Sequence, residues 1–178
     1  MLAAVAVLAF LHNLSLGAWT AIAWPSLLLI TGLLLLLLIY PRHPLSDWPA
    51  IWRDPQQRQH TIIAGAVAAA GAAELLQSRS SAWAYVWPAA LLIVGILFLT
   101  HAQHGTGAAV ERAVWKHRWL GATLMGAGLL RFIEIIGGVV LWWPLILLAA
   151  AVQLVLYREP AGAFEGERHI PNEHTRNP

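Results

Sequence analysis

The chain has 178 residues, of which 58% are hydrophobic and 11% are charged, and its formal net charge is +2. A soluble domain is typically ~45–50% apolar and ~25% charged, so the composition excludes an ordinary soluble globular protein. The chain has no cysteine, which excludes disulfides, iron–sulfur clusters and thiolate metal sites. Lys116 is the only lysine, and so small a positive charge does not predict nucleic-acid binding.

Long uncharged stretches predict membrane-spanning helices. Residues 1–41, 80–110 and 135–157 contain no Asp, Glu, Lys or Arg, and apolar runs of ~18 or more residues are typical of transmembrane helices. We predict an all-α, polytopic membrane bundle of six helices, paired as three hairpins, within a single domain over residues 1–157. The predicted spans cover approximately residues 2–23, 25–40, 60–77, 83–104, 117–136 and 139–157.

Two segments lie outside these spans. Residues 41–59 mix Trp48 and Trp52 with charged side chains, which indicates a short segment on the membrane interface. Residues 158–178 are polar and contain three prolines, and they predict a mobile cytoplasmic tail.

The positive charges predict the orientation of the bundle. They gather in the links after the second and fourth spans and after the sixth span, at Arg42, Arg53, Arg58, Arg112, Lys116, Arg118 and Arg158. Positive residues near span ends favour the cytoplasmic side. We therefore expect an integral protein of a bacterial-type inner membrane with both termini in the cytoplasm.

A Trp-Pro pair recurs three times, at Trp24-Pro25, Trp87-Pro88 and Trp143-Pro144. Proline suits the first turn of a helix and tryptophan suits the membrane interface. Each pair therefore predicts the start of an even-numbered span at the outer face, and most of the ten tryptophans are expected to be interfacial anchors. The pairs indicate either a repeated hairpin or the independent use of residues that are common at the starts of membrane helices.

Four histidines are predicted at the inner ends of spans. His60 and His117 open the third and fifth spans, whereas His101 and His104 close the fourth. His101 and His104 are three residues apart and share a helix face. Imidazole binds zinc, copper and haem iron, so the four histidines predict a metal site, although each is also a common interfacial residue.

A spacing of 14 residues links these histidines to ionisable residues farther along. Glu74 follows His60 by 14 positions, as Arg131 follows His117. Fourteen helical steps return to within ~40° of the starting direction and rise ~21 Å. Because a lone charge in the bilayer is costly, Glu74 and Arg131 predict an ion pair with Glu134 as a third member. Such a pair indicates either a structural clamp or a proton path.

Small and medium apolar residues lie between the histidine and the ionisable residue on each helix. They are Ala64, Val67 and Gly71 on one span and Gly121, Leu124 and Gly128 on the other. Small residues allow helices to approach closely, and they also leave space for a flat macrocycle.

This spacing resembles the pattern of dihaem membrane cytochromes of the b type, in which two parallel helices each carry two histidines separated by 13 residues. His60 and His117 match one ligand layer, whereas Glu74 and Arg131 replace the other. The resemblance covers the third to fifth spans and implies one haem b between His60 and His117. The histidines at span ends are also similar to those of His-rich membrane proteins that handle copper.

These patterns favour electron transfer or metal handling over a self-contained enzyme. The expected cofactor is haem b or a single copper or zinc ion, and the expected partners are the lipid bilayer and a redox partner. The alternative is a cofactor-free accessory subunit of a membrane complex, which the Leu-rich stretch at residues 33–38 favours. A third alternative is a small transporter. Transporters are expected to have discontinuous helices and polar groups near mid-membrane, where His12 is the main polar residue of this chain.

Overall fold

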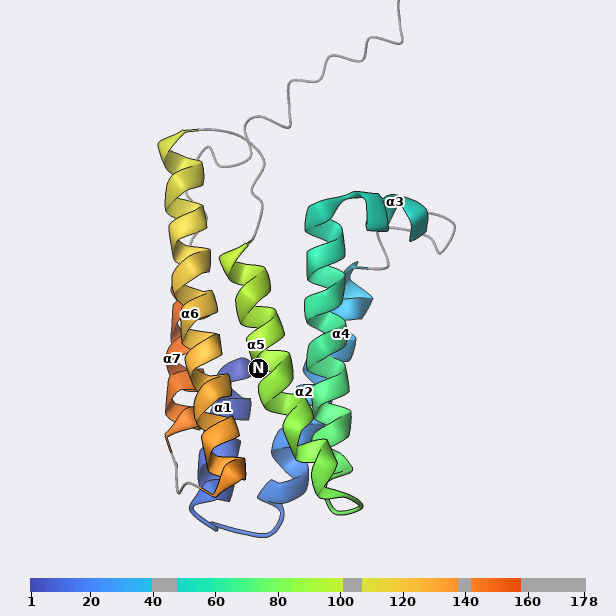
Figure 1. Ribbon diagram of the computed structural model, residues 1–178, viewed down its shortest axis with the longest axis vertical. Helices are drawn as coiled ribbons and strands as arrows, with labels where there is room; N and C mark the ends of the chain where they lie inside the picture. The colour runs from blue at the N-terminus through green and yellow to red at the C-terminus, as the bar shows by residue number, and fades with distance from the viewer. Residues whose placement is uncertain (40–47, 101–106, 138–141, 158–178) are drawn as a thin grey trace, which may run out of the picture.

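The computed structural model describes residues 1–39, 48–100, 107–137 and 142–157. Across these ranges all regular structure is helical, so the all-α prediction is confirmed for the described part of the chain (Figure 1). The elements are α1 (Leu2–Asn13), α2 (Thr20–Ile39), α3 (Trp48–Arg53), α4 (Pro55–Leu75), the 3₁₀ helix η3 (Ser81–Tyr85), α5 (Val86–Leu99), α6 (Ala108–Ile136) and α7 (Trp143–Val155).

Three helical stretches are long and apolar enough to cross a membrane. They are α2, the combined stretch Ser81–Leu99 and α6. The helices α1 and α7 are apolar but shorter, and α4 is rich in alanine and glycine rather than in large apolar residues. The described helices are therefore compatible with an integral membrane protein in which at least three stretches have the composition of a span.

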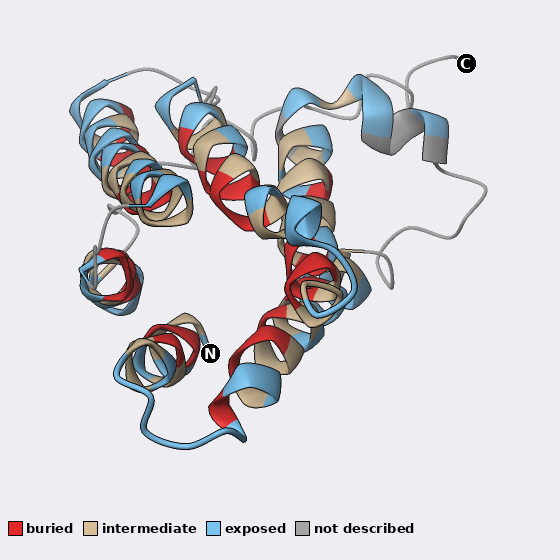
Figure 2. Cartoon of the chain, turned by 60° about the horizontal axis from the view of Figure 1, so that its bottom comes forward, coloured by how far each residue is buried: buried red, intermediate tan, exposed pale blue. Residues whose placement is uncertain are grey.

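The six longer helices form a closed ring. Each packs against the next in chain order, from α1 through α2, α4, α5 and α6 to α7, and α7 returns to contact α1. Figure 2 shows the helices arranged around a common centre, with their buried faces turned inward. In this ring α5 lies between α4 and α6, so residues on α4 and α6 meet only where their side chains reach past α5.

Glycines bring two pairs of helices close together. A Cβ atom added at Gly32 or Gly71 would overlap the backbone of the facing helix, at Ala68 and Leu29 respectively. Gly121 faces Gly95 in the same way across α5 and α6. Such contacts provide the van der Waals packing that holds helices together where no hydrophobic effect operates between them.

The three Trp-Pro tryptophans form a buried cluster rather than interfacial anchors. Trp24, Trp87 and Trp143 are at most 3% exposed, and their ring centroids lie 6.0–6.4 Å apart in all three pairings. The anchor prediction is therefore wrong for these three, because their rings point into the ring of helices. Other tryptophans do lie on the surface, including Trp19, Trp83, Trp115, Trp119 and Trp142.

Several predicted helix boundaries are wrong. A turn with Ser15 at φ 56° and Gly17 at φ 114° separates α1 from α2, so α2 begins at Thr20 and Pro25 lies inside it. The helices α4 and α6 begin at Pro55 and Ala108, well before the histidines that were expected to open them. The apolar run marks the part of a helix suited to lipid, whereas polar residues with good helix propensity extend the helix beyond it.

The predicted interfacial segment 41–59 is only partly described. It contains the short helix α3 and the first residues of α4, whereas residues 40–47 lie outside the described ranges. The predicted tail, residues 158–178, also lies outside them.

Candidate histidine site

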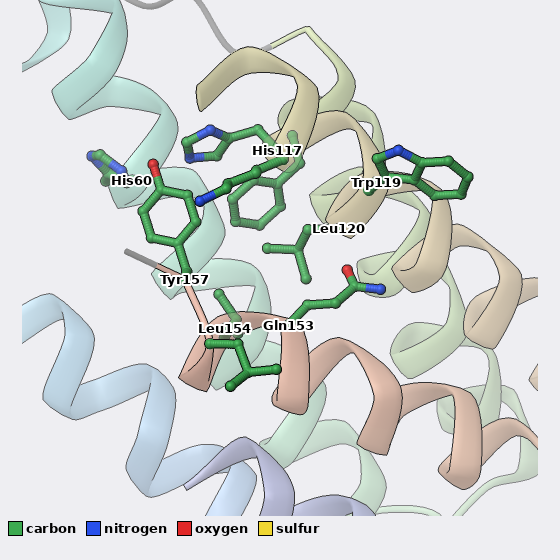
Figure 3. Close-up of a pocket in the computed structure, with 10 residues that line it drawn as sticks. His60, His117, Trp119, Leu120, Gln153, Leu154 and Tyr157 are labelled. Carbon is green, nitrogen blue, oxygen red and sulfur yellow. The ribbon is translucent and has the colours of Figure 1, made fainter. Parts of the chain in front are cut away.

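His60 and His117 line the same pocket although they lie on α4 and α6, which are not neighbours in the ring. The pocket has a volume of about 480 Å³ and lies among α4, α5, α6 and the end of α7. Figure 3 shows the two imidazoles near each other, His60 from α4 and His117 from α6, with the Tyr157 ring next to them. The ring of helices thus brings together the two histidines that the sequence singled out.

The His117 side chain is oriented by its own helix. Its Nδ1 atom lies 2.8 Å from the carbonyl oxygen of Ala113, one turn earlier. A carbonyl only accepts hydrogen bonds, so Nδ1 carries the proton, and the lone pair of the neutral ring is on Nε2. Histidines that bind metals are commonly held in this way by a carbonyl on the opposite ring nitrogen.

Two aromatic rings hold the imidazole of His117 in place. The Phe98 ring stacks on it with a centroid distance of 5.7 Å and an interplanar angle of 19°. The Tyr157 ring meets it edge to face at 5.4 Å. Contacts of this kind restrict rotation of the imidazole and fix its orientation in the pocket.

His60 lies at the rim of the pocket. It is exposed, whereas His117 is half-buried, and it sits in the second turn of α4 because that helix begins at Pro55. The Asp54 carboxylate just before the helix accepts a hydrogen bond from the Gln57 N–H at 3.3 Å, as an N-cap does. The cap fixes the start of α4 and thereby the position of His60 along it.

The remaining lining combines apolar side chains with the Gln153 amide and one cation, Lys116. Leu120, Leu154 and Leu156 contribute apolar surface, and the Lys116 Nζ atom lies 5.3 Å from the Tyr157 ring centroid. No carboxylate occurs among the described residues that line the pocket. The described lining is therefore mainly apolar and carries positive rather than negative charge.

The two other histidines of the predicted metal site, His101 and His104, lie outside the described ranges, as do His43, His169 and His174. Within the described ranges, no three His, Asp or Glu side chains are grouped to hold a metal ion. The described part of the site is thus a pair of histidines.

The ionisable residues form a separate layer at the other end of the bundle. The Arg131 guanidinium lies 3.8 Å from Glu74 and 2.6 Å from Glu134, and Gln77 donates a hydrogen bond to the same Glu74 carboxylate. Arg131 also lies over the Trp143 ring, 5.3 Å from its centroid. Each of these charged side chains therefore has a protein partner inside the bundle, as buried charges require, whereas the Glu74 Oε1 and Arg131 Nε atoms have no hydrogen-bond partner there.

His12, the predicted mid-membrane histidine, has a local partner. Its Nδ1 lies 3.3 Å from the Thr20 hydroxyl oxygen, and that hydroxyl donates to the Gly17 carbonyl at 2.6 Å. The hydroxyl proton is used, so the hydroxyl oxygen accepts from Nδ1–H. This arrangement satisfies His12 within the turn between α1 and α2.

Sequence reasoning did not find Phe98, Lys116 and Tyr157 as site residues. Tyr157 follows α7 and is 40 positions from His117, and neither its residue type nor its spacing signals contact with an imidazole. Lys116 carried a usable signal, because it is the only lysine and precedes His117 directly.

Comparison with known proteins adds no relative. No protein-family model, curated protein or solved structure matches this chain. The resemblance to b-type cytochromes therefore stays a prediction, and the case for function depends on the histidine site itself.

Proposed function

We propose that this chain is an integral membrane protein that holds a haem b between His60 and His117 and passes single electrons. The observation that carries the proposal is the placement of both imidazoles at one pocket, with the His117 Nδ1–H held by the Ala113 carbonyl. A haem bound there would supply one-electron redox chemistry.

The residues present fit such a group. Neutral imidazole nitrogens are common axial ligands of haem iron, and the hydrogen bond at Nδ1 raises the basicity of the opposite nitrogen. Phe98, Leu120 and Leu154 offer apolar surface to a macrocycle. Lys116 is placed at the same pocket, where its ammonium would pair with the carboxylates of a haem.

The same proposal includes six spans and an orientation. The basic residues Arg53, Arg58, Arg112 and Arg118 lie at the end of the bundle where α4 and α6 begin, which is also the end of the histidine site. By the bias of positive charge toward the cytoplasm, this end faces inward in a bacterial-type inner membrane, and both termini are cytoplasmic.

The test is the visible absorption spectrum of the protein purified from membranes. We expect a Soret band in the unmodified chain and its loss in His60→Ala and in His117→Ala. His12→Ala is the matched control, because His12 is hydrogen-bonded to Thr20 and does not line the pocket, and it is expected to keep the band. His104→Ala should keep it as well.

Elemental analysis of the same samples separates the alternatives. Copper or zinc in the sample, without a Soret band, would indicate a metal site in place of the haem. For a site made of four histidines, alanine at His60, His101, His104 or His117 should each weaken metal binding. Folded protein that is colourless and free of metal, recovered only within a larger assembly, would overturn both and favour the accessory subunit.

A further inference from the structure

A second cavity adjoins the histidine pocket and lies in the middle of the bundle. It has a volume of about 330 Å³ and shares His60, Phe98 and Leu154 with that pocket. Every one of the six longer helices contributes to its wall, through residues such as Val5, Leu28, Val67, Leu91, Leu124 and Leu147. A group bound at the histidines would therefore lie next to the interior of the ring.

The wall of this cavity is apolar. Thr31 is its hydroxyl-bearing residue, and that hydroxyl donates to the Leu27 carbonyl at 2.7 Å, so its proton is already used. Water needs two or more polar partners to occupy a cavity, and cavities lined by Leu, Val and aromatic side chains stay dry. The chemistry of the wall thus disfavours an ion or a chain of water molecules and suits a hydrocarbon group.

The cavity is long relative to its volume. Along α5 it extends from Trp87 to Phe98, eleven positions that correspond to ~16 Å of helix. The glycines that the sequence offered as space for a macrocycle are used elsewhere, since Gly71 and Gly121 contact neighbouring helices. Val67 and Leu124, from the same two helix faces, line the cavity instead. The remaining space suits a single extended chain rather than a flat ring.

We infer that the haem held at the histidine site carries a prenyl chain, and that the apolar cavity between His60 and Trp87 accommodates this chain. The inference rests on the proposed haem function and replaces haem b with a prenylated haem at the same site. Lys116 lines the histidine pocket and not the cavity, so the charged and apolar parts of such a cofactor have separate environments.

The test is a titration of cofactor-free protein with haem b and with a haem that bears a farnesyl chain, followed by visible absorbance. Because each buried methylene favours binding, we expect the farnesyl haem to bind about tenfold more tightly or better. Cofactor extracted from protein purified from membranes should likewise have the mass of a prenylated haem.

Variants of α5 assign the difference to the cavity. Ala90 is 5% exposed and lines the cavity, so Ala90→Phe should fill it and abolish the preference while leaving haem b affinity unchanged. Ile93→Phe is the matched control on the same helix, because Ile93 is 48% exposed, and it should keep the preference. If Ala90→Phe does not fold, Val67→Phe places the same ring in the same cavity from α4.

The outcomes are distinguishable. Equal affinity of the unmodified protein for both haems overturns the inference and leaves the proposed function standing, as does a preference that survives in folded Ala90→Phe protein. Failure of both haems to bind overturns the proposed function as well.

Discussion

Arg131 on α6 reaches past α5 to lie 3.8 Å from the Glu74 carboxylate on α4. The side chain of Glu74 is 2% exposed and that of Arg131 is 14% exposed, so the pair is buried. Glu134 joins the same guanidinium at 2.6 Å from one turn along α6. This contact links two helices that are not neighbours in the ring, and it lies at the opposite end of the bundle from His60 and His117.

Removing one partner of this ion pair should be strongly destabilising. Arg131→Leu leaves the Glu74 carboxylate buried without its cation, and the expected loss in free energy of unfolding is about 3–5 kcal/mol. The measurement is thermal unfolding in detergent. The double variant Glu74→Leu with Arg131→Leu should recover most of the loss, because no uncompensated charge remains. Equal stability of the double and the single variant would contradict the pairing.

The close approach of α2 and α4 should be sensitive to a single methyl group. Gly32→Ala places a Cβ against the Ala68 backbone, and overpacking of this kind costs about 1–3 kcal/mol. Gly65→Ala is the control on α4, since a Cβ there meets nothing within 4 Å. Alanine is the better helix former, so the control should be neutral or stabilising by up to ~1 kcal/mol. Similar melting temperatures for the two variants would show that the helices do not cross at Gly32.

The tryptophan cluster should contribute much more than surface tryptophans do. Trp143 is 1% exposed and contacts Trp24, Trp87 and Arg131, and Trp143→Ala is expected to cost about 3–5 kcal/mol. Trp142, its neighbour in the chain, is 63% exposed, and Trp142→Ala should change stability by no more than ~0.5 kcal/mol in detergent. Unfolding followed by tryptophan fluorescence distinguishes the two. Equal losses of stability in the two variants would mean that the tryptophan cluster does not stabilise the core.

The proposed orientation can be tested with single cysteines, because the chain contains none. Ser81 precedes α5 and Glu111 lies in the first turn of α6, and both are exposed. In intact cells, a membrane-impermeant thiol reagent should label Ser81→Cys from the outside and should label Glu111→Cys only after the membrane is opened. The reverse result would invert the orientation and place the histidine site at the outer face.

Sequence alone was sufficient to predict an all-helical protein, and it supplied the candidate residues. Long uncharged stretches require helices, because a backbone inside a bilayer has no water to bond with. The spacing of 14 residues pointed to His60 with Glu74 and to His117 with Arg131, since a helix returns side chains to one face at a fixed period. These inferences use local periodicity and the cost of isolated charge, and both are properties of a single helix.

Tertiary structure decided everything that depends on which helices meet. Neither periodicity nor composition gives the order of helices around the ring, so the Tyr157 and Phe98 contacts with His117, the burial of Trp24, Trp87 and Trp143, and the apolar cavity were not predictable. The predicted starts of α4 and α6 were also wrong, since these helices begin at Pro55 and Ala108. An apolar run marks the part of a helix that suits lipid, whereas the backbone hydrogen bonds of the helix continue beyond that run. The local sequence pattern determines where helices form, whereas long-range packing determines which side chains are in contact.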